Sequence, residues 1–588
     1  MISDSVPAQT PEPQPTGGEP SITPSARPRW LIPGAAAVAV LAVAIGLVAG
    51  MTLTNRAGAG SGTASYVPAD AAAYYELRLD LPGDQRPALR SFLAHFPLLQ
   101  VDKYLTDELD QQLDQLSSAA PSGYRYSTDV KPWFDGKLGF ALVRYPTIIP
   151  NATTAVPDAL VLVGVKDATA AGTLNDRVRA DLTKAGATIT STSHAGVTIW
   201  SANGGSTETT RGMPKQFAWA ITADQLIGGT GVDLVSQALD SHSGAAPSLA
   251  TRDEFAAGLA RLPDDRVLTL SVDFKTVLAQ VQKDVASSQP SAAAALSEIV
   301  AQTPTYAVVS ARFENDRFVM DGSATMSSAA PANSDRGLAA LTPSDAIYFA
   351  DGSNIGKGLA GSLNSLKGLP VASGDVGAQT LDQVEAALGG DLGSFVSWMG
   401  DTALVGGYTN STPWIGIIST PTDAQAARSK LLQLRSILQL ASANGSAQVQ
   451  ISEADHNGTQ ITTIHVEAGK EVPSWASTLQ YAVTDQRVVI GSGDSFVARV
   501  LDMQSANSLA SNPRFRAALD SVGGASNTSD FWFDLAGLRT ALEPLVPADS
   551  QAIYQSSIKP LVAPFDYAVG AGKSDGQQIE SRFAIVVK

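Results

Sequence analysis

SLATRDEFAAGL (Ser248–Leu259) and SLASNPRFRAAL (Ser508–Leu519) are two versions of one segment, separated by 260 positions in a chain of 588 residues. The triplet His194-Ala195-Gly196 matches His456-Asn457-Gly458 at a separation of 262. Two further matches, at separations of 262 and 261, are Gly229-Thr230-Gly231 with Gly491-Ser492-Gly493 and Tyr306-Ala307-Val308 with Tyr567-Ala568-Val569. A nearly constant separation over so many positions predicts an internal duplication, and such a repeat decides the architecture of a chain.

The duplication divides the chain into two repeats. We predict ectodomain repeat 1 over residues 66–326 and ectodomain repeat 2 over residues 341–588, because Pro68-Ala69-Asp70 opens the first and Pro343-Ser344-Asp345 opens the second. A small polar linker over residues 327–340 joins them. The roughly 520 residues after the N-terminal region exceed what one hydrophobic core usually spans, which agrees with at least two domains.

Each repeat mixes strand-like and helical patterns. Runs rich in Val, Ile, Tyr and Phe, such as VTIWSA from Val197 and VLTLSVDF from Val267, are bounded by Gly, Asn and Asp and predict antiparallel hairpins. Helix start signals stand at Asp167 and at Thr420-Pro421. The pattern predicts an α+β fold with two tandem homologous domains, each a mostly antiparallel sheet with helices packed on one face, behind a single N-terminal transmembrane helix.

The predicted membrane segment is WLIPGAAAVAVLAVAIGLVAGMTL, Trp30–Leu53, which contains no charged side chain. Its 24 residues, at about 1.5 Å each, form roughly 36 Å of helix, enough to cross a hydrocarbon layer of about 30 Å. We therefore predict a transmembrane helix over residues 30–53, after a disordered tail over 1–29 and before a flexible linker over 54–65. A cleaved signal peptide is the alternative, although its apolar core would be only about 7 to 15 residues long.

Charges beside this segment predict its orientation. Arg27 and Arg29 precede it, while only Arg56 follows it closely. Since positive charge stays on the inner side, the N-terminus is predicted to be cytoplasmic and the C-terminal repeats extracytoplasmic, as in a single-pass signal-anchor protein of the cell membrane. Gly46 and Gly50 have the spacing at which small residues let two helices approach, so a weak homodimer through these residues is a hypothesis.

Composition excludes several classes of function. A net charge of −16 argues against nucleic acid as a partner, because phosphate binding needs a basic surface. The absence of Cys excludes thiol catalysis, thiolate metal sites and disulfides. The five His residues show no spacing typical of a metal site, and His194 and His456, each followed by a turn, are interpreted as turn residues. We therefore expect no metal and no cofactor.

Two glycine-containing motifs have a structural and a functional interpretation. Gly570-Ala571-Gly572-Lys573-Ser574 is similar to a phosphate-binding loop, but Tyr567 stands where that loop needs Gly, so a hairpin turn is the better interpretation. The repeated glycines at 229–231 and 491–493 lead from a strand into a helix. They either allow tight packing, which we favour, or hold an anion on backbone N–H groups.

Carboxylates and tryptophans also recur in both repeats. The carboxylate pairs are Asp70 with Asp345, Asp240 with Asp502, and Asp273 with Asp534. Paired acids can perform general acid–base work in a cleft, but places at turns and element ends favour helix caps. Trp133 and Trp398 either fill equivalent core positions or line a pocket for an apolar or sugar ligand. No GxSxG sequence occurs, and the sequence assigns no catalytic, cofactor-binding or metal residue.

These landmarks resemble a known bacterial family. The Pro and Asp before the first strand (Pro68, Asp70), the Trp before a strand (Trp133, Trp398), the SLA segments and the closing Tyr-Ala-Val strands are similar to the family called domain of unknown function 3352. The resemblance covers nearly the whole ectodomain. It implies an exported or membrane-anchored protein of the cell envelope and supports the duplicated α+β fold, and it implies no activity, substrate or catalytic residue.

Two classes of function remain open, with a third as a weaker hypothesis. The first is a non-enzymatic envelope protein whose repeats bind or scaffold an envelope protein, polymer or lipid, in a sharper form with a groove at their junction. The second is an extracytoplasmic hydrolase with a dispersed active site, whose ionisable groups with perturbed pKa would meet in a pocket of one repeat only. The third is a lipid-binding carrier, since a concave sheet can shelter acyl chains.

Overall fold

The computed structural model describes residues 62–99, 110–111, 114, 124–144, 157–204, 216–288, 303–360, 385–386, 390–409, 412–443, 448–466, 474–493 and 495–588. They belong to one compact unit, Gly50–Lys588. Among the helices of these residues none is both long and apolar enough to cross a membrane. The predicted tail over 1–29, the predicted transmembrane helix over 30–53 with Gly46 and Gly50, and most of the linker over 54–65 lie outside the described ranges.

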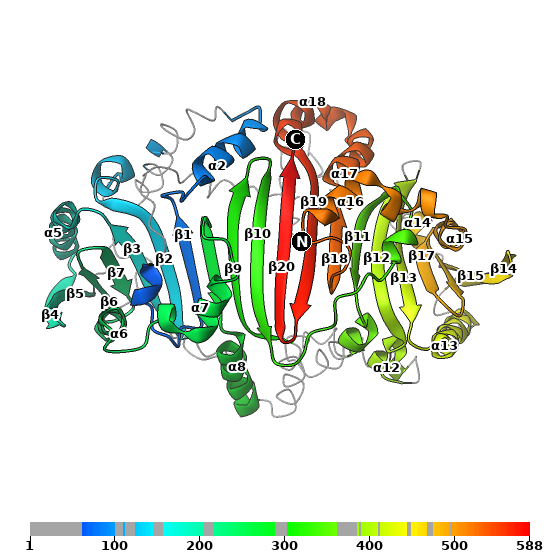
Figure 1. The fold of residues 1–588 in the computed structure, drawn as a ribbon, viewed down its shortest axis with the longest axis horizontal. Coiled ribbons are helices and arrows are strands. Elements are labelled where there is room, and N and C mark those ends of the chain that lie inside the picture. Colours follow the sequence, from blue (N-terminus) through cyan, green and yellow to red (C-terminus); the bar gives the residue numbers. More distant parts are fainter. Residues whose placement is uncertain are drawn as a thin grey trace, which may run out of the picture. The chain divides into compact units, whose positions relative to one another are not determined.

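Twenty strands within these ranges form one sheet (Figure 1), and every pairing between neighbours is antiparallel. The strands of the first half are β1 (Ala73–Arg78), β2 (Phe134–Arg144), β3 (Asp158–Val165), β4 (Thr188–His194), β5 (Val197–Asn203), β6 (Gln216–Ile221), β7 (Gln225–Gly229), β8 (Leu268–Val272), β9 (Pro304–Glu314) and β10 (Arg317–Met326). The strands of the second half are β11 (Ala346–Gly352), β12 (Met399–Thr409), β13 (Thr412–Pro421), β14 (Val449–His456), β15 (Thr459–Val466), β16 (Thr478–Val483), β17 (Val488–Ser492), β18 (Ser529–Phe533), β19 (Phe565–Asp575) and β20 (Gln578–Val587).

The strand order is the same when it is read inward from either edge of the sheet. From one edge it runs β4, β5, β6, β7, β3, β2, β1, β8, β9, β10. From the other edge it runs β14, β15, β16, β17, β13, β12, β11, β18, β19, β20. Each strand therefore has a counterpart ten places later in the chain. The division into separate domains at 66–326 and 341–588 stays a prediction.

The two halves share their sheet, because β10 pairs with β20 from Arg317 opposite Val586 to Thr325 opposite Gln578. The prediction of one sheet in each repeat is therefore wrong. Pairing at the junction satisfies backbone groups that two separate sheets would leave on open edges. Asp321 lies opposite Arg582 near the middle of this pairing. The two residues are 261 positions apart, which is the separation of the repeats, so the pseudo-two-fold axis passes through this pair.

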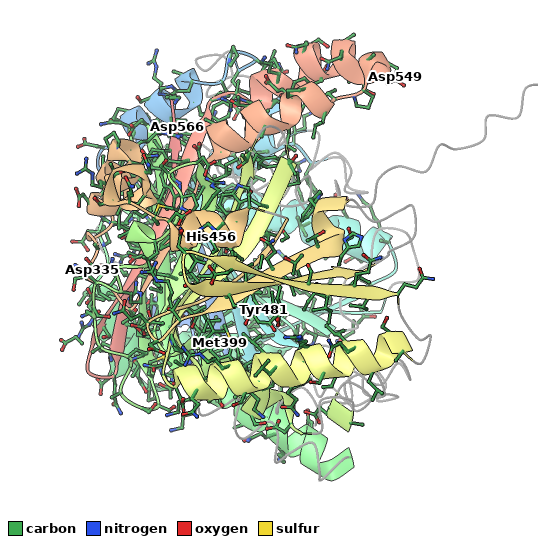
Figure 2. All side chains as sticks on the ribbon, turned by 90° about the vertical axis from the view of Figure 1, so that its right-hand side faces the viewer. Asp335, Met399, His456, Tyr481, Asp549 and Asp566 are labelled. Carbon is green, nitrogen blue, oxygen red and sulfur yellow. The ribbon has the colours of Figure 1, made fainter. Side chains whose placement is uncertain are left out.

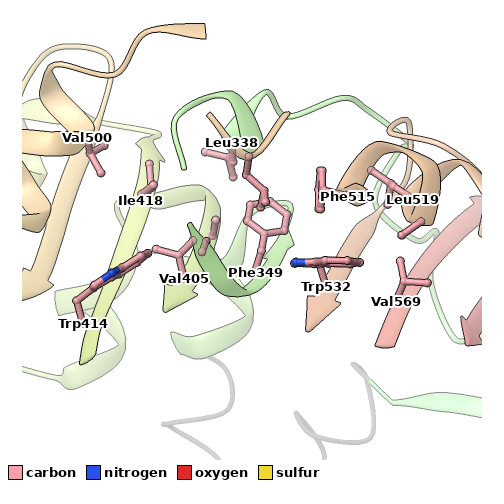
Figure 3. Close-up of a cluster of buried hydrophobic side chains, with 14 of the residues drawn as sticks. Leu338, Phe349, Val405, Trp414, Ile418, Val500, Phe515, Leu519, Trp532 and Val569 are labelled. Atoms are coloured by element: carbon pink, nitrogen blue, oxygen red, sulfur yellow. The ribbon is translucent and has the colours of Figure 1, made fainter. Parts of the chain in front are cut away.

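One face of the sheet, which we call the core face, packs against helices in both halves. In the first half Leu160 and Leu162 of β3 form a cluster with Leu234 and Val235 of α6. The equivalent cluster of the second half, drawn in Figure 3, is built around Trp532. The helices that contribute side chains to these two clusters are α6 (Val232–Ser243), α7 (Asp253–Leu259), α15 (Phe496–Leu501) and α16 (Pro513–Asp520).

The opposite face also carries helices, at its outer ends. Val163 and Val165 alternate with the residues of β3 that point to the core face, so they point the other way. They pack in a cluster with Ala171 and Leu174 of α5 (Ala168–Lys184). The prediction of helices on one face only is therefore wrong. Within the apolar run ALVLVGV of β3, the part from Leu162 to Val165 is covered on both sides, whereas Val161 is 44% exposed.

The second half repeats this arrangement around α13 (Ala424–Ala443). Met399 and Tyr481 form a cluster with Ala427 and Leu431 of this helix. Figure 2 shows Met399 and Tyr481 between the strands and α13. Helices therefore cover both faces at each outer end of the sheet.

The helix start predicted at Asp167 is confirmed, because its side chain accepts hydrogen bonds from the backbone N–H groups of Thr169 and Ala170 at the start of α5. The start predicted at Thr420-Pro421 is wrong. Pro421 ends β13, and Asp423 accepts the equivalent hydrogen bonds at the start of α13. Asp423, three residues after Thr420, is the cap because its carboxylate accepts from two N–H groups.

Candidate functional site

The middle of the sheet carries an apolar row on the face opposite the core face. Side chains directly opposite one another on neighbouring strands point to the same face. Through such pairs Val161 is followed by Phe140, Tyr75, Leu270 and Val309, across β3, β2, β1, β8 and β9. Every position of the row is apolar or aromatic, and Phe140 is 46% exposed.

A second row crosses from the first half into the second. Met320 of β10 faces Phe583 of β20, and Gly570 of β19 lies between Phe583 and Phe531 of β18. Beyond β11 the row continues at Leu404 of β12. The ring centroids of Phe531 and Phe583 are 5.8 Å apart. The junction of the two halves is therefore part of the same apolar surface.

We call this surface the apolar face. Its residues are Tyr75, Phe140, Val161, Leu270, Val309, Met320, Tyr348, Leu404, Ile415, Phe531, Phe533 and Phe583. Leu404 is 44% exposed and Ile415 is 54% exposed. The solvent-facing side of an antiparallel sheet is ordinarily polar, and contiguous exposed apolar side chains mark a surface that contacts a partner, a ligand or a membrane.

The tyrosines of the apolar face do not add charge to it. Burial raises the pKa of Tyr75 and the pKa of Tyr348 above the ordinary value of 10.0. Both hydroxyl groups therefore stay neutral at physiological pH. The ring of Tyr348 also packs edge-to-face against Phe531 and Phe533, at centroid distances of 5.8 and 6.0 Å.

A helical segment at one end of the central strands exposes further apolar side chains. Figure 1 shows its helices α17 and α18 beside the end of β19 and β20. It comprises α17 (Leu535–Leu542), α18 (Gln551–Ile553) and α19 (Lys559–Val562). Its exposed residues are Leu545, Ile553, Ile558 and Leu561, at 46% to 62%. Apolar surface is therefore available on this segment as well as on the sheet.

A separate pocket of about 480 Å³ lies in the first half, at the start of α6. Its charged groups are Arg144 at the end of β2, Asp158 at the start of β3, and Asp233 in the first turn of α6. Arg144 Nη1 and Asp158 Oδ2 are 3.3 Å apart. Further lining residues are Ser201, Asn203, Phe217 and Gln237. The pocket thus combines carboxylates, amides and one aromatic ring.

The corresponding place in the second half is filled by aromatic side chains. Trp414 of β13 and Asp158 of β3 are equivalent, because each stands two residues before the residue that lies opposite the repeated glycine, Gly491 or Gly229. The ring of Trp414 stacks on Phe496 at a centroid distance of 5.1 Å, and both residues are buried. At the position of the pocket residue Asp158, the second half therefore carries a buried aromatic ring.

In each repeat, the His that precedes the turn is hydrogen-bonded to one of the repeated carboxylates. His194 Nε2 lies 2.6 Å from Asp240 Oδ1, and His456 Nε2 lies 2.9 Å from Asp502 Oδ2. Each pair links the tip of a hairpin to a helix, and the residue after each His has a positive φ. Figure 2 labels His456 at its hairpin. The interpretation of both His residues as turn residues is confirmed.

Asp273 and Asp534 begin helices, as the cap interpretation predicted. Each accepts a hydrogen bond from the backbone N–H three residues later, at 2.9 and 2.7 Å. Each also binds a guanidinium: Asp273 Oδ2 is 2.9 Å from Arg252 Nη2, and Asp534 Oδ2 is 2.7 Å from Arg514 Nη1. The two arginines occupy different positions in the repeated SLA segments, so the aligned sequences gave no sign of this shared ion pair.

The structure also shows where the remaining repeated residues and the glycine-containing segment lie. Asp70 is exposed, whereas Asp345 Oδ1 accepts from Arg499 Nη2 at 2.6 Å. Trp133 and Trp398 are each 4% exposed, which confirms that they are core residues. The segment 570–574 lies inside β19, and the turn to β20 follows it at Gly576-Gln577, so a hairpin is present but the segment itself is strand and not the turn. Across the described ranges no group of three or more His, Asp or Glu side chains could hold a metal ion.

A buried charged cluster lies around Arg336, within the stretch predicted as a linker. Arg336 Nη2 is 2.7 Å from Asp351 Oδ1 and 2.8 Å from Asp530 Oδ2. The three side chains are 0%, 4% and 7% exposed. Asn527 donates a hydrogen bond from Nδ2 to Asp530 Oδ1. In the first half Glu76 and Thr269 hold the places of Asp351 and Asp530, so one carboxylate is missing there.

The pKa values of both acids in the cluster are raised. Burial, with the charge of Asp351 as the second cause, raises the pKa of Asp530 to about 7. Burial also raises the pKa of Asp351 above its ordinary value. One guanidinium cannot neutralise two carboxylates, so a proton on Asp530 removes the surplus negative charge. These acids do not line the pocket at α6, and their burial favours a structural role.

Stability should therefore fall as pH rises from about 5 to 8. Between pH 4 and 7 folded Asp530 holds a proton that the unfolded chain has lost, so folding takes up a proton. The free energy of unfolding is then highest at the acid end of this window and decreases by roughly 1–3 kcal/mol by its upper end. Urea unfolding at a series of pH values measures this. Asp530→Asn should flatten the curve, and an unchanged slope in this variant would contradict the assignment.

A family model described as "Protein of unknown function (DUF3352)" matches residues 34–574. The chain belongs to the DUF3352 family. Among curated proteins there is no match. Two solved structures are similar to part of this DUF3352 protein: crystal form I of TP0453 (7% identity, TM-score 0.22, covering 46% of this chain and 81% of that one) and crystal form III of TP0453 (8%, 0.23, 46% and 82%).

Three features of this DUF3352 protein were not predicted from its sequence: the apolar face, the pocket at α6 and the cluster at Arg336. Alternating apolar residues on a strand, such as Leu268 and Leu270 of β8, indicate that they point to one face of the sheet. They do not indicate whether helices cover that face or leave it exposed. The Asp158 and Trp414 positions differ between the repeats, and an alignment of strands β3 and β13 could have shown this. Arg336 stands in a polar stretch that contains no signal of burial.

Proposed function

We propose that this protein is a non-enzymatic binding protein, anchored to the outer side of the cell membrane, that holds lipid acyl chains on its apolar face. The observation that carries the proposal is the apolar face, which combines exposed and half-buried side chains across the sheet. Its exposed residues, at 36% to 54%, are Phe140, Val161, Leu270, Met320, Leu404 and Ile415. Removing such side chains from water stabilises a complex by about 25 cal/mol per Å² of apolar area.

The choice of lipid over a protein partner rests on two arguments. First, the apolar face lies within the sheet, where backbone N–H and C=O groups already pair with neighbouring strands, so a ligand gains contact with side chains only. An acyl chain needs nothing more. Second, the predicted transmembrane helix ends at Leu53 and the described chain begins at Gly62. The nine Cα–Cα steps from Leu53 to Gly62 span at most about 32 Å, so the predicted anchor would tether the start of the described chain near the bilayer.

The alternative functions fit the contacts less well. A groove at the junction of the repeats is not supported, because β10 and β20 pair there as neighbouring strands. The hydrolase hypothesis requires perturbed acids in a pocket of one half. Asp351 and Asp530 are perturbed and occur in one half, but their side chains are only 4% and 7% exposed.

The test is the binding of a dansyl-labelled fatty acid. The strands and hydrophobic clusters described above all follow residue 61, so a chain that starts at Ala57 keeps the complete sheet. We expect saturable binding with a blue-shifted dansyl emission. The double variant Phe140→Ser with Leu270→Ser removes two side chains that lie two strands apart on the apolar face, within reach of one acyl chain. It should weaken binding about ten-fold or more, because ten-fold corresponds to about 1.4 kcal/mol and two buried apolar side chains exceed that.

Leu440→Ser supplies the matched control. Leu440 is 63% exposed on α13 but is not part of the helix's packed cluster, which contains Leu431 and Leu438. It should bind the fatty acid as the unaltered chain does. Absence of saturable binding, or equal weakening by the control and the double variant, would refute the proposal.

A further inference from the structure

We propose that the pocket at the start of α6 binds a neutral saccharide. This proposal concerns a different surface from the apolar face and does not depend on lipid binding. It starts from the comparison of the two halves, because the second half shows that the fold can close this space. Trp414 stands there in place of Asp158 and stacks on Phe496, and the two residues are 6% and 1% exposed. An open pocket lined by charged and amide groups is therefore not a requirement of the architecture.

Around these equivalent positions of the two halves, a larger side chain on one element is matched by a smaller residue on its neighbour. Leu160 of β3 and Gly416 of β13 are equivalent, since they lie opposite Gly229 and Gly491. A Cβ atom at Gly416 would lie only 2.0 Å from the ring of Phe496, so the larger ring needs glycine beneath it. Likewise, a Cβ atom at Gly407 would lie 2.4 Å from the ring of Trp414. The second half is thus packed shut, whereas the first half keeps about 480 Å³ open.

The charges of the pocket disfavour ionic ligands. Asp158 and Asp233 outnumber Arg144, and Arg144 already pairs with Asp158 at 3.3 Å. Asp233 also offsets the positive end of the α6 dipole, so the helix start does not attract a phosphate or sulfate. A metal ion would need a cluster of ligating side chains, and the described part of the chain contains none.

The remaining chemistry suits hydroxyl groups. Carboxylates accept hydrogen bonds from hydroxyls, while the side-chain amides of Asn203 and Gln237 both donate and accept. Phe217 adds an apolar surface for the C–H groups of a sugar ring. A volume of about 480 Å³ falls in the range of ligand pockets, roughly 300–1,000 Å³. A neutral saccharide, such as a segment of an envelope polysaccharide, presents the matching groups.

The full chain, kept in a zwitterionic detergent without a sugar headgroup, can be tested by calorimetric titration. The probes are neutral trisaccharides of glucose, mannose, galactose and arabinose, with a sulfated trisaccharide as the anionic counterpart. We expect saturable binding of at least one neutral probe and none of the sulfated probe. Binding of the sulfated probe alone, or of no probe, would overturn the proposal.

A variant that copies the second half gives the sharpest comparison. Asp158→Trp introduces the side chain that the second half carries at the equivalent position, Trp414, and should fill part of the pocket, with a loss of binding of about ten-fold or more. Gln237→Ala, on the surface of α6, serves as a second variant that leaves the strands unaltered and should also weaken binding. Ser243→Ala, at the far end of the same helix, should bind normally. Unchanged binding by both pocket variants would refute the assignment.

Discussion

Replacing Arg336 with methionine should lower the free energy of unfolding by about 3–5 kcal/mol, because removing one partner of a buried ion pair leaves the other charges uncompensated. The Arg336 side chain is fully buried, and Asp351 and Asp530 are 4% and 7% exposed beside it. Urea unfolding measures the loss, which should be larger at pH 8 than at pH 5, since Asp530 has a pKa of about 7 and is protonated at the lower pH.

Two comparisons separate this effect from general damage. Adding Asp351→Asn and Asp530→Asn to the Arg336→Met variant should restore much of the lost stability, because no unpaired carboxylate then remains in the interior. Arg428→Met removes an exposed arginine of α13 that pairs with the exposed Asp485, and it should cost less than about 1 kcal/mol. A loss of similar size in both arginine variants would contradict the role assigned to the buried cluster.

Arg582→Asp should also destabilise the protein, by about 1–3 kcal/mol, since it places a second carboxylate opposite Asp321 at the junction of the halves. Arg582 Nε donates to Asp321 Oδ1 at 2.7 Å, and Asp321 is 8% exposed. Arg582 is partly accessible to water, which places the expected loss below that of the Arg336 variant. Thermal and urea unfolding should report one shared transition that moves to lower stability.

The swapped pair Asp321→Arg with Arg582→Asp tests whether the two charges interact directly. The pair lies on the pseudo-two-fold axis, so the swap exchanges equivalent positions. The swap should restore only part of the free energy of unfolding that Arg582→Asp loses. An arginine at position 321 would lie beside Arg312, whose Nη1 is 3.2 Å from Asp321 Oδ2. A coupling energy of about 1 kcal/mol or more in the double-mutant cycle is expected. Strictly additive losses would show that the pair does not join the halves energetically.

Repetition in the sequence predicted much of the fold. The separations of 260 to 262 between landmarks such as Ser248 and Ser508 have their counterpart in a strand order that repeats after ten strands. Antiparallel hairpins, the core places of Trp133 and Trp398, and the turns at His194 and His456 followed from residue type and local pattern. These are features that depend on a few neighbouring residues.

Features that depend on distant residues were not predictable in the same way. Leu162 and Val163 are both apolar, and only the positions of α5 and α6 reveal that they are covered from opposite sides. The sequence identified His194 and Asp240 but could not show that a hairpin tip and a helix would bring them to 2.6 Å. Arg336 could not be predicted as buried, because its partners Asp351 and Asp530 come together only when β11 and β18 pair.

The last strand in the chain completes the middle of the sheet. β20 covers Gln578–Val587, and its neighbour β10 was synthesised about 250 residues earlier. Contacts between such distant segments form slowly, so each half can organise its own strands well before the seam closes. Until the C-terminus leaves the ribosome, β10 and β19 therefore present unpaired edges to other nascent chains. A premature stop before Gln578 would release a chain whose two half-sheets lack the strand that pairs them.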